Sequence, residues 1–348
     1  MADKIRVGII GTGGIARGAH VPGYKELPDV EIAAVCDVAF DRAKALADEL
    51  GAEAYADHNE MLNRAKLDAV SVCTPNAYHK QPTIDALRAG VHVLCEKPIA
   101  KNQVEGAEMV RVAKETGKIL TIGLMTRFNP GPQAIRRYFD AGDLGEVYYC
   151  RDQYLRRRGI PTWGVFHIKE KSGGGPLIDI GVHILDLAMW LMGNPKPVSV
   201  TGATYAKFGR RTDVVGVRGL TEKIASEYDV EDMATAYVRF ANGATLTLET
   251  SWASEIEQDM QQVELFGDRG GAKLSPLTLY KQENGTLVDL KPTQLGNYGG
   301  HKAEIAHFVK CIKGEAEVLV KPEEALDVQK VLDGIYRSAE MGREIAIE

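Results

Sequence analysis

Apolar positions in the first third of the chain form short runs, and longer amphipathic stretches separate these runs. Six runs rich in Val, Ile and Ala share this form: residues 5–11, 30–37, 53–57, 67–75, 90–98 and 118–123. Between some of them, apolar residues recur at helical spacing over residues 39–50, 79–89 and 104–116. Continuous apolar strands that alternate with helices are typical of a parallel sheet covered on both faces. Residues 1–126 are therefore predicted to form an α/β domain with a doubly wound, Rossmann-type parallel sheet.

The pattern changes after this point, and residues 127–348 are predicted to form a second α/β domain. Helical spacing at 132–141 is followed by strand-like alternation at 145–156 and by a flexible glycine segment before an apolar helix at 178–192. Alternation with a period of two then dominates residues 198–208, 233–240, 244–253 and 261–267. This alternation predicts an open, mainly antiparallel sheet. Two helices are predicted to close the chain, at residues 301–313 and 322–341.

Composition excludes several function classes. The chain has 348 residues, 42 Lys and Arg against 48 Asp and Glu, and a net charge of −6, which argues against a nucleic-acid partner. No apolar run reaches the roughly 20 residues that span a bilayer, and the first residues lack the pattern of a signal peptide. The five cysteines are widely spaced without a CxxC pair, which predicts free thiols in a reducing compartment. We therefore expect a cytoplasmic protein without a membrane segment or a metal site.

The loop after the first apolar run has the spacing of a dinucleotide-binding turn. Gly11 and Gly13 fit a tight turn and a close backbone approach to a pyrophosphate, and Ala16 takes the third small position. The following helix presents its N–H groups to the phosphates. Residues Gly11, Thr12, Gly13, Gly14 and Ile15 are predicted to hold a dinucleotide. The alternative is an ordinary glycine turn between a strand and a helix.

Polar residues at the ends of the second and fourth strands extend this cofactor site. Asp37 is placed to accept the ribose hydroxyls of NAD and would repel the 2′-phosphate of NADP, although Arg42 in the next helix weakens that preference. The alternative role of Asp37 is to cap that helix. Thr74, Asn76 and the following His79 are predicted to contact the ribose and nicotinamide, with a simple proline turn as the alternative. NAD is thus the expected cofactor and NADP the less favoured one.

The segment Cys95–Pro98 places an amine at the end of the fifth predicted strand, where open α/β sheets bind ligands. A positively charged nicotinamide disfavours the ammonium form of Lys97, which then suits it to handle the proton of a substrate hydroxyl. Glu96 is predicted to tune this lysine or to reach the cofactor, and Pro98 stiffens the turn. The alternative for Lys97 is a solvent-exposed surface lysine.

Three motifs in order, "GTGGIA", "EKP" and "GGGPLIDIGVH", resemble those of the Gfo/Idh/MocA oxidoreductase family over essentially the whole chain. The resemblance implies an N-terminal Rossmann domain and a C-terminal domain whose sheet binds substrate on one face and another subunit on the other. It implies that Lys97 is catalytic and that Asp179 and His183 line the substrate. It also implies a sugar or polyol substrate and a homodimer or homotetramer.

Residues Asp179 and His183 stand four positions apart and therefore share one face of the predicted helix. The histidine is suited to take the hydroxyl proton, while Asp179 orients it or binds a neighbouring hydroxyl. The alternative is a structural Asp–His pair in the core. The expected reaction transfers a hydride between a secondary alcohol and the nicotinamide. Two rival functions are a glycosidase that oxidises its sugar transiently and a non-catalytic NAD-dependent sensor.

Substrate selection is predicted to rest on polar and aromatic residues at and after the domain junction: Arg127, Asn129, Tyr154, Arg157 and Trp163. The indole of Trp163 is suited to stack on a sugar ring, and one arginine to bind an acidic or hydroxyl group. The alternative for at least two of the arginines at 156–158 is a solvated charge run. Weaker candidates are His167, Tyr237 and His301.

Overall fold

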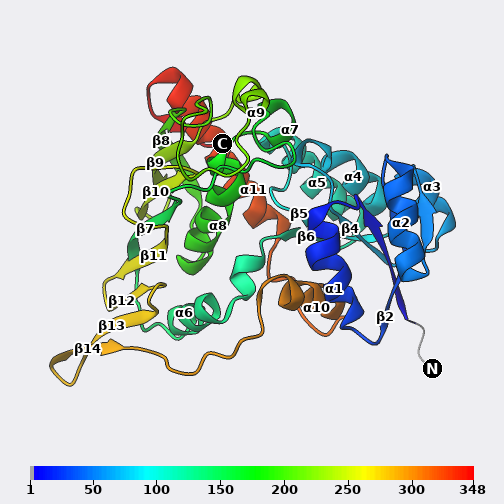
Figure 1. Ribbon diagram of the computed structural model, residues 1–348. Coiled ribbons are helices and arrows are strands. Elements are labelled where there is room, and N and C mark those ends of the chain that lie inside the picture. The colour runs from blue at the N-terminus through cyan, green and yellow to red at the C-terminus, as the bar shows by residue number, and fades with distance from the viewer. Residues whose placement is uncertain (1–3) are drawn as a thin grey trace. The chain divides into compact units, whose positions relative to one another are not determined.

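The computed structural model describes residues 4–348, and its internal contacts divide the chain into two compact units. Unit 1 contains the described residues up to Phe128 together with Tyr298–Leu326 (Figure 1). Unit 2 contains Asn129–Asn297 together with Asp327–Glu348. Both units combine helices with one sheet, so the predicted α/β class is confirmed.

Unit 1 is built on a parallel sheet of six strands, in the order β3-β2-β1-β4-β5-β6. The strands are β1 (Ile5–Ile10), β2 (Val30–Cys36), β3 (Glu53–Tyr55), β4 (Ala69–Val72), β5 (His92–Glu96) and β6 (Leu120–Gly123). All six coincide with the predicted runs, because buried parallel strands require continuous apolar sequence. The strand order reverses between β1 and β4, and ligands of such sheets bind at this switch point.

Helices pack on both faces of this sheet. They are η1 (Ala16–His20), α1 (Val21–Lys25), α2 (Phe40–Leu50), α3 (His58–Arg64), η2 (Asn76–Tyr78), α4 (Lys80–Arg88), α5 (Gln103–Thr116), η3 (Met125–Phe128) and α10 (Gly300–Ile312). Asn102 caps α5 by accepting the amide of Glu105, and Gly117 ends that helix in the left-handed conformation. Val7 and Ile9 pack under α1, α2 and α10, whereas Gly8 faces Met61 of α3.

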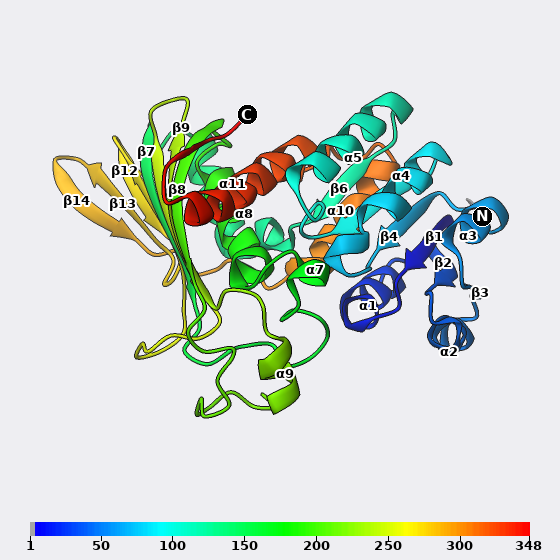
Figure 2. The same cartoon turned by 90° about the horizontal axis from the view of Figure 1, so that it is seen from above.

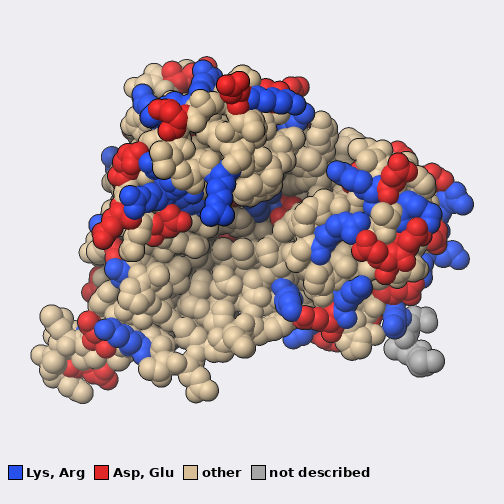
Figure 3. Space-filling view, viewed as in Figure 1, with Lys and Arg blue, Asp and Glu red and all other residues tan. Residues whose placement is uncertain are grey.

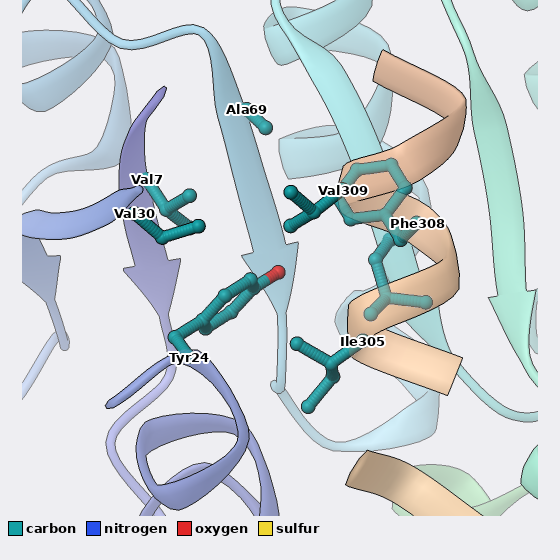
Figure 4. Close-up of a cluster of buried hydrophobic side chains, with 8 residues drawn as sticks. Val7, Tyr24, Val30, Ala69, Ile305, Phe308 and Val309 are labelled. Carbon is teal, nitrogen blue, oxygen red and sulfur yellow. The ribbon is translucent and has the colours of Figure 1, made fainter. Parts of the chain in front are cut away.

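Helix α10 joins unit 1, although the sequence analysis assigned residues 127–348 to a single second domain. Its residues Ile305, Phe308 and Val309 form one buried cluster with Val7 and Tyr24, as Figure 4 shows. The helix lies more than 170 residues after β6 in the chain, and its own periodicity does not identify the surface that it covers. Unit 1 therefore ends at Phe128 in its first segment and takes in Tyr298–Leu326 as a second one, which the prediction had placed in the second domain.

Unit 2 is built on a mixed sheet of nine strands, in the order β14-β13-β12-β11-β7-β10-β9-β8-β15 (Figure 2). The strands are β7 (Val147–Leu155), β8 (Pro197–Tyr205), β9 (Met233–Phe240), β10 (Thr245–Ser251), β11 (Met260–Gly267), β12 (Gly270–Lys273), β13 (Thr278–Glu283), β14 (Thr286–Leu290) and β15 (Ile345–Ala346). Within this nine-stranded sheet, β7 and β10 pair in parallel, and the other neighbouring strands pair antiparallel. The expectation of a mainly antiparallel sheet is confirmed, and β12–β15 extend it beyond the strands predicted.

The helices of unit 2 are α6 (Pro130–Asp140), α7 (Lys169–Ser172), η4 (Leu177–Gly181), α8 (Val182–Leu191), α9 (Glu222–Glu227) and α11 (Pro322–Met341), of which α11 begins in unit 1. The predicted apolar helix at 178–192 starts as a π-helical turn, η4, before α8. The stretch Lys169–Leu191 is long and apolar enough to cross a membrane, but 89% of its most apolar window is buried within the protein. The buried part of this stretch, η4 and α8, belongs to the core of unit 2.

Charged side chains of both signs are interspersed on the face of the molecule drawn in Figure 3. No broad cationic surface is visible on that face, in keeping with the net charge of −6.

Candidate active site

The predicted site residues fall in both units, and the cofactor residues all lie in unit 1. Gly11 has a φ of +90°, and a Cβ there would stand 2.7 Å from the carbonyl oxygen of Cys73, so the turn brings the glycine loop against the end of β4. At Gly13 and Gly14 a Cβ would meet no atom within 4 Å. Open space over a glycine turn that leads directly into a helix fits a pyrophosphate.

The carboxylate of Asp37 lies beside this loop and is buried. Its Oδ2 accepts hydrogen bonds from the amide and the hydroxyl of Thr12, both at 2.9 Å, and its Oδ1 accepts the amide of Ala39. Arg42 donates to both oxygens from an exposed position. Burial alone would raise the pKa of Asp37, but these bonds outweigh it and lower that pKa. Asp37 therefore carries an anchored negative charge. The N-cap position of α2 is taken by Ala39, so the predicted capping role of Asp37 is wrong, although Asp37 accepts the amide of Ala39. Its role as a ribose acceptor stays a prediction.

His79 occupies a buried position between two strand-end loops. Its Nδ1 lies 2.8 Å from the carbonyl oxygen of Pro98, and its Nε2 lies 2.9 Å from that of Thr74. Burial lowers the pKa of His79. Because the side chain is fully buried, this histidine ties the loop after β4 to the loop after β5, which is a different position from the cofactor contact expected of it. Thr74 and Asn76 remain partly accessible beside it.

Glu96 and Lys97 follow directly at the end of β5, where the Lys97–Pro98 bond is cis. The Glu96 carboxylate is buried; it accepts the backbone amide of Lys97 at 3.2 Å and contacts Nε2 of His20 at 2.9 Å. Burial would raise the pKa of Glu96, but the hydrogen bond and charge of His20 and the charges of His301 and Lys97 lower it to about 2. A carboxylate is therefore fixed beside the partly accessible Lys97.

The residues predicted to line the substrate lie in unit 2, where a buried glutamate fixes the start of their helix. Both carboxylate oxygens of Glu231 accept the amide of Gly175 at 3.0 Å, and one also accepts the amide of Leu177 at 3.1 Å. The hydroxyl of Tyr336 donates to the same carboxylate at 2.8 Å. Burial raises the pKa of Glu231 despite these bonds. They satisfy amides that a helix start leaves without partners.

The glycines before this helix are closely packed, so the flexible segment expected from the sequence is wrong. A Cβ at Gly174 would stand 2.0 Å from the hydroxyl oxygen of Tyr336, and one at Gly175 would stand 2.1 Å from the carbonyl oxygen of Glu231. Only glycine allows this approach. Gly174 and Gly175 therefore allow the backbone to pack closely against Tyr336 and Glu231.

Asp179 and His183 project from η4 and α8, and both are partly accessible. The indole Nε1 of Trp252 donates to Oδ2 of Asp179 at 3.0 Å, and Trp252 is fully buried. The ring of Phe166 meets Trp252 edge-on at 6.5 Å, and Trp163 meets Phe166 edge-on at 6.3 Å. Three aromatic side chains thus lead from the carboxylate to the surface, where Trp163 is 65% exposed.

Of the remaining substrate candidates, the arginines hold loops in place. Arg127 is fully buried in unit 1, where it pairs with Glu324 and donates to the carbonyl of Leu319. Arg157 donates to the carbonyl of Glu257, and Arg158 donates to the carbonyl of Val215. Arg156 lies over the ring of Tyr154 at 5.4 Å. Arg157 is exposed, whereas Arg156 and Arg158 are partly buried and donate to backbone carbonyls, so the alternative that at least two of these three arginines form a solvated charge run is wrong. Asn129 precedes α6 as its N-cap residue but makes no capping bond through its side chain.

The three weaker candidates lie in different surroundings. Tyr237 lies on the face of the unit 2 sheet opposite Ala236 and Val238, which are buried, and is partly covered by Arg239 at 5.1 Å. His167 is buried, 3.6 Å from a carboxylate oxygen of Glu227. His301 lies in the first turn of α10 in unit 1, and its charge helps to lower the pKa of Glu96. Only His301 is thus placed near a residue of the predicted cofactor site within its own unit.

Sequence reasoning missed four residues that position the predicted site: His20, Trp252, Glu231 and Tyr336. Each acts on a residue at least 54 positions away along the chain, beyond the reach of local patterns. One signal was available: Ser71 interrupts the buried apolar strand β4, and its hydroxyl contacts His20 at 2.9 Å. A hydroxyl inside such a strand needs a polar partner.

Two family models match most of the chain. A model described as "Oxidoreductase family, NAD-binding Rossmann fold" matches residues 5–124, and one described as "Oxidoreductase family, C-terminal alpha/beta domain" matches residues 136–347. The D-glucoside 3-dehydrogenase of Escherichia coli (strain K12) is 38% identical, over 99% of this chain and 98% of its own length. The scyllo-inositol 2-dehydrogenase (NAD(+)) of Bacillus subtilis (strain 168) is 27% identical, over 90% and 87%.

A solved structure shows the same fold. The oxidoreductase domain protein from Kribbella flavida superposes with a TM-score of 0.87 over 99% of both chains, at 23% identity. At that identity the likeness concerns the fold alone.

Proposed function

Because this chain belongs to the Gfo/Idh/MocA oxidoreductases, and is an NAD-binding enzyme of sugars or polyols, we propose that it oxidises a secondary hydroxyl group of a glucoside. The 3-hydroxyl is the favoured position, since the relative that shares 38% of its residues is a D-glucoside 3-dehydrogenase. The observation that carries the proposal within the structure is the buried indole of Trp252, which orients Asp179 one helical turn before His183.

The proposed roles follow from the chemistry of the side chains. His183 accepts the proton of the substrate hydroxyl, and Lys97 donates a hydrogen bond to the same oxygen. Asp179, held by Trp252, binds an adjacent hydroxyl or orients His183. Bound in unit 1, NAD⁺ would supply the hydride acceptor for the hydrogen of the carbinol carbon, so that the alcohol would become a ketone.

Cofactor binding is assigned to the glycine loop and the strand ends of unit 1. Gly13 and Gly14 would leave room for the pyrophosphate, and the carboxylate of Asp37 would hold the adenosine ribose, which would favour NAD. The exposed Arg42 beside Asp37 is the residue that would tolerate a 2′-phosphate. Replacing Arg42 with alanine should therefore weaken any NADP binding more than NAD binding.

A homodimer or homotetramer remains part of the proposal. The face of the unit 2 sheet that carries Tyr237 also presents Tyr149, bonded to Thr247, and Arg151, bonded to Glu264. Aromatic and paired polar groups of this kind suit a subunit interface. Sedimentation of the purified protein tests this directly, and a monomer at micromolar concentration would contradict it.

The test of function is a panel of methyl glucosides, disaccharides, glucose and inositols with NAD⁺ and NADP⁺ in parallel, followed by absorbance at 340 nm. We expect NADH formation with glucosides, and a 3-keto product by NMR. Lys97→Ala and His183→Ala should abolish turnover yet leave NAD⁺ affinity within about threefold, whereas Lys101→Ala serves as the matched lysine control. Release of the aglycone without net NADH would instead favour transient oxidation. Full activity of Lys97→Ala would refute the assignment of this residue.

A further inference from the structure

One of the three tryptophans of the chain lies on the surface of unit 2. Trp190 and Trp252 are buried, whereas Trp163 is 65% exposed, and no Phe or Tyr side chain among residues 4–348 is more exposed. An exposed indole keeps a large apolar area in water, and covering that area with a ligand is favourable. Single apolar side chains are also common on protein surfaces, so the surroundings of Trp163 decide what it does.

Trp163 is the outer end of the aromatic row that begins at Asp179. The indole of Trp252 donates to the carboxylate of Asp179 at 3.0 Å. Phe166 meets Trp252 edge-on at 6.5 Å, and Trp163 meets Phe166 edge-on at 6.3 Å. Exposure increases along this row, from the fully buried Trp252 through the partly buried Phe166 to Trp163. The row therefore leads outward from the residue that is proposed to bind a hydroxyl of the sugar.

The inner part of the row is fixed by the core of unit 2. Phe166 packs against a cluster of buried side chains that includes the residue directly after Asp179: Ile160, Ile180, Tyr228, Val230, Trp252 and Ala253. Edge-on contacts between aromatic rings add to the free energy of this packing. A shift of Phe166 would disturb the core, so the ring next to Trp163 is held in place relative to Asp179.

The loop that carries Trp163 is anchored beside the indole. Pro161 is buried, and the hydroxyl of Thr162 donates to the carbonyl oxygen of Arg218 at 2.9 Å. Gly164 has a φ of +65°, the left-handed conformation that favours glycine, and it turns the chain directly after Trp163. A ligand that covers the indole therefore has few residues to order, which lowers the cost of binding.

The shape of a glucoside fits the two ends of this row. In the proposed reaction, Asp179 and His183 bind the sugar ring that is oxidised, whereas the aglycone leaves that ring at C1 and projects beyond it. Two further aromatic rings separate Trp163 from Asp179, so Trp163 is placed for a group attached to the sugar. A second sugar or a carbocycle has a face of C–H groups that stacks on an aromatic side chain.

We propose that Trp163 is the platform of an aglycone subsite, on which the apolar face of a ring attached through C1 of the glucoside stacks. The inference rests on the proposed function and adds the class of glucoside that the enzyme prefers, one whose aglycone contains a ring. A methyl glucoside lacks this ring and leaves the indole in water. Trp163 thus selects among substrates and takes no part in the transfer of the hydride or the proton.

The first test measures the ratio of kcat/KM for cyclohexyl and methyl glucosides, as both anomers, in the full-length enzyme with NAD⁺. We expect the wild type to prefer the cyclohexyl compound roughly tenfold, and Trp163→Ala to lose this preference. Trp163→Phe keeps a ring and should retain the preference within about threefold. Tyr280→Ala removes an exposed ring from β13 and is the matched control, which should keep the wild-type ratio.

A disaccharide measured beside these compounds identifies the kind of ring. A parallel loss on the disaccharide in Trp163→Ala assigns the subsite to sugar rings as well, whereas a loss on the cyclohexyl compound alone assigns it to carbocycles.

The second test needs no turnover and uses 3-deoxy glucosides, which have no hydroxyl to oxidise at C3. With NAD⁺ present, the cyclohexyl 3-deoxyglucoside should reduce the quenching of tryptophan fluorescence by acrylamide roughly twofold, because it covers the exposed indole. The methyl 3-deoxyglucoside should leave the quenching unchanged. Trp163→Phe should lack the protected signal, since Trp190 and Trp252 are buried. Equal quenching with both compounds would overturn the inference.

The outcomes separate the inference from the function on which it rests. A wild-type protein that oxidises no glucoside would refute the proposed function, and the quenching would then decide the subsite alone. An active wild type whose ratio does not change in Trp163→Ala would refute the subsite and leave the function intact. Equal losses on both glucosides also leave the ratio unchanged and would count against it in the same way. Should Trp163→Ala fail to fold, Trp163→Leu provides the same comparison, because it keeps apolar volume and removes the ring.

Discussion

Replacing Glu231 with glutamine tests the hydrogen bonds that hold the start of the proposed catalytic helix. The carboxylate accepts the amide of Gly175 on both oxygens, and on one of them it also accepts the amide of Leu177 and the hydroxyl of Tyr336. A glutamine keeps the shape of this side chain but turns one acceptor into a donor. Whichever way the amide faces, its NH₂ group meets at least one backbone N–H.

The magnitude follows from these contacts. Each hydrogen bond to a charged group contributes about 1.5–3 kcal/mol, against about 1 kcal/mol for a neutral one. Weakening three bonds and losing the fourth costs about 3–5 kcal/mol, and the easier burial of a neutral amide returns part of it. We therefore expect a net loss of about 2–3 kcal/mol, or roughly 5–10 °C in the unfolding temperature of a unit this size.

Calorimetry of the wild type and of Glu231→Gln at pH 8 measures this loss, with Tyr336→Phe as the matched control that removes a single donor. The control should lose about 1.5 kcal/mol, the lower end of the range for a hydrogen bond to a charged group. Hydrogen exchange of the peptide that contains Gly175 and Leu177 should increase in Glu231→Gln. We also expect kcat to fall more than KM rises, because the helix carries His183. A variant as stable as the wild type, with unchanged exchange, would refute the reasoning.

Three further changes are predicted from the described contacts. Trp252→Phe removes the indole donor to the carboxylate of Asp179 and should lower kcat roughly tenfold. Trp163→Phe at the surface should change kcat less than about threefold. Equal effects of the two substitutions in steady-state assays would contradict the role of Trp252 in positioning Asp179. Glu96 has a pKa lowered to about 2 from 4.5, so it stabilises the fold fully above pH 4.5 and loses this contribution as the pH falls toward 2. Urea unfolding should show the advantage of wild type over Glu96→Gln shrinking by about 3 kcal/mol across that window, and a constant difference would count against it. Gly175→Ala places a Cβ 2.1 Å from the carbonyl oxygen of Glu231 and should lower the free energy of unfolding by several kcal/mol. The control Gly18→Ala adds a Cβ that meets no atom within 4 Å, so it should change the free energy of unfolding by less than about 1 kcal/mol in the same thermal unfolding experiment.

Much of the fold could be predicted because its signals are local. Each of the six parallel strands is a continuous apolar run, and the helices α2, α4 and α5 agree with the predicted ranges within a residue or two at each end. The glycine turn, Asp37 and the end of β5 were found because each directly follows a strand, where an open sheet binds ligands. Such features need only neighbouring residues to form.

The sequence by itself thus determined the six strands of unit 1, its main helices, the order of the motifs and the residue types that we propose for binding a cofactor and a hydroxyl. Only the tertiary structure decided which distant groups control them. His20 and Glu96 are 76 positions apart, Trp252 and Asp179 are 73 apart, and α10 returns to unit 1 after the whole sheet of unit 2. The physical reason is that periodicity and turn chemistry report on residues within one element, whereas hydrogen bonds between buried groups depend on how the elements pack.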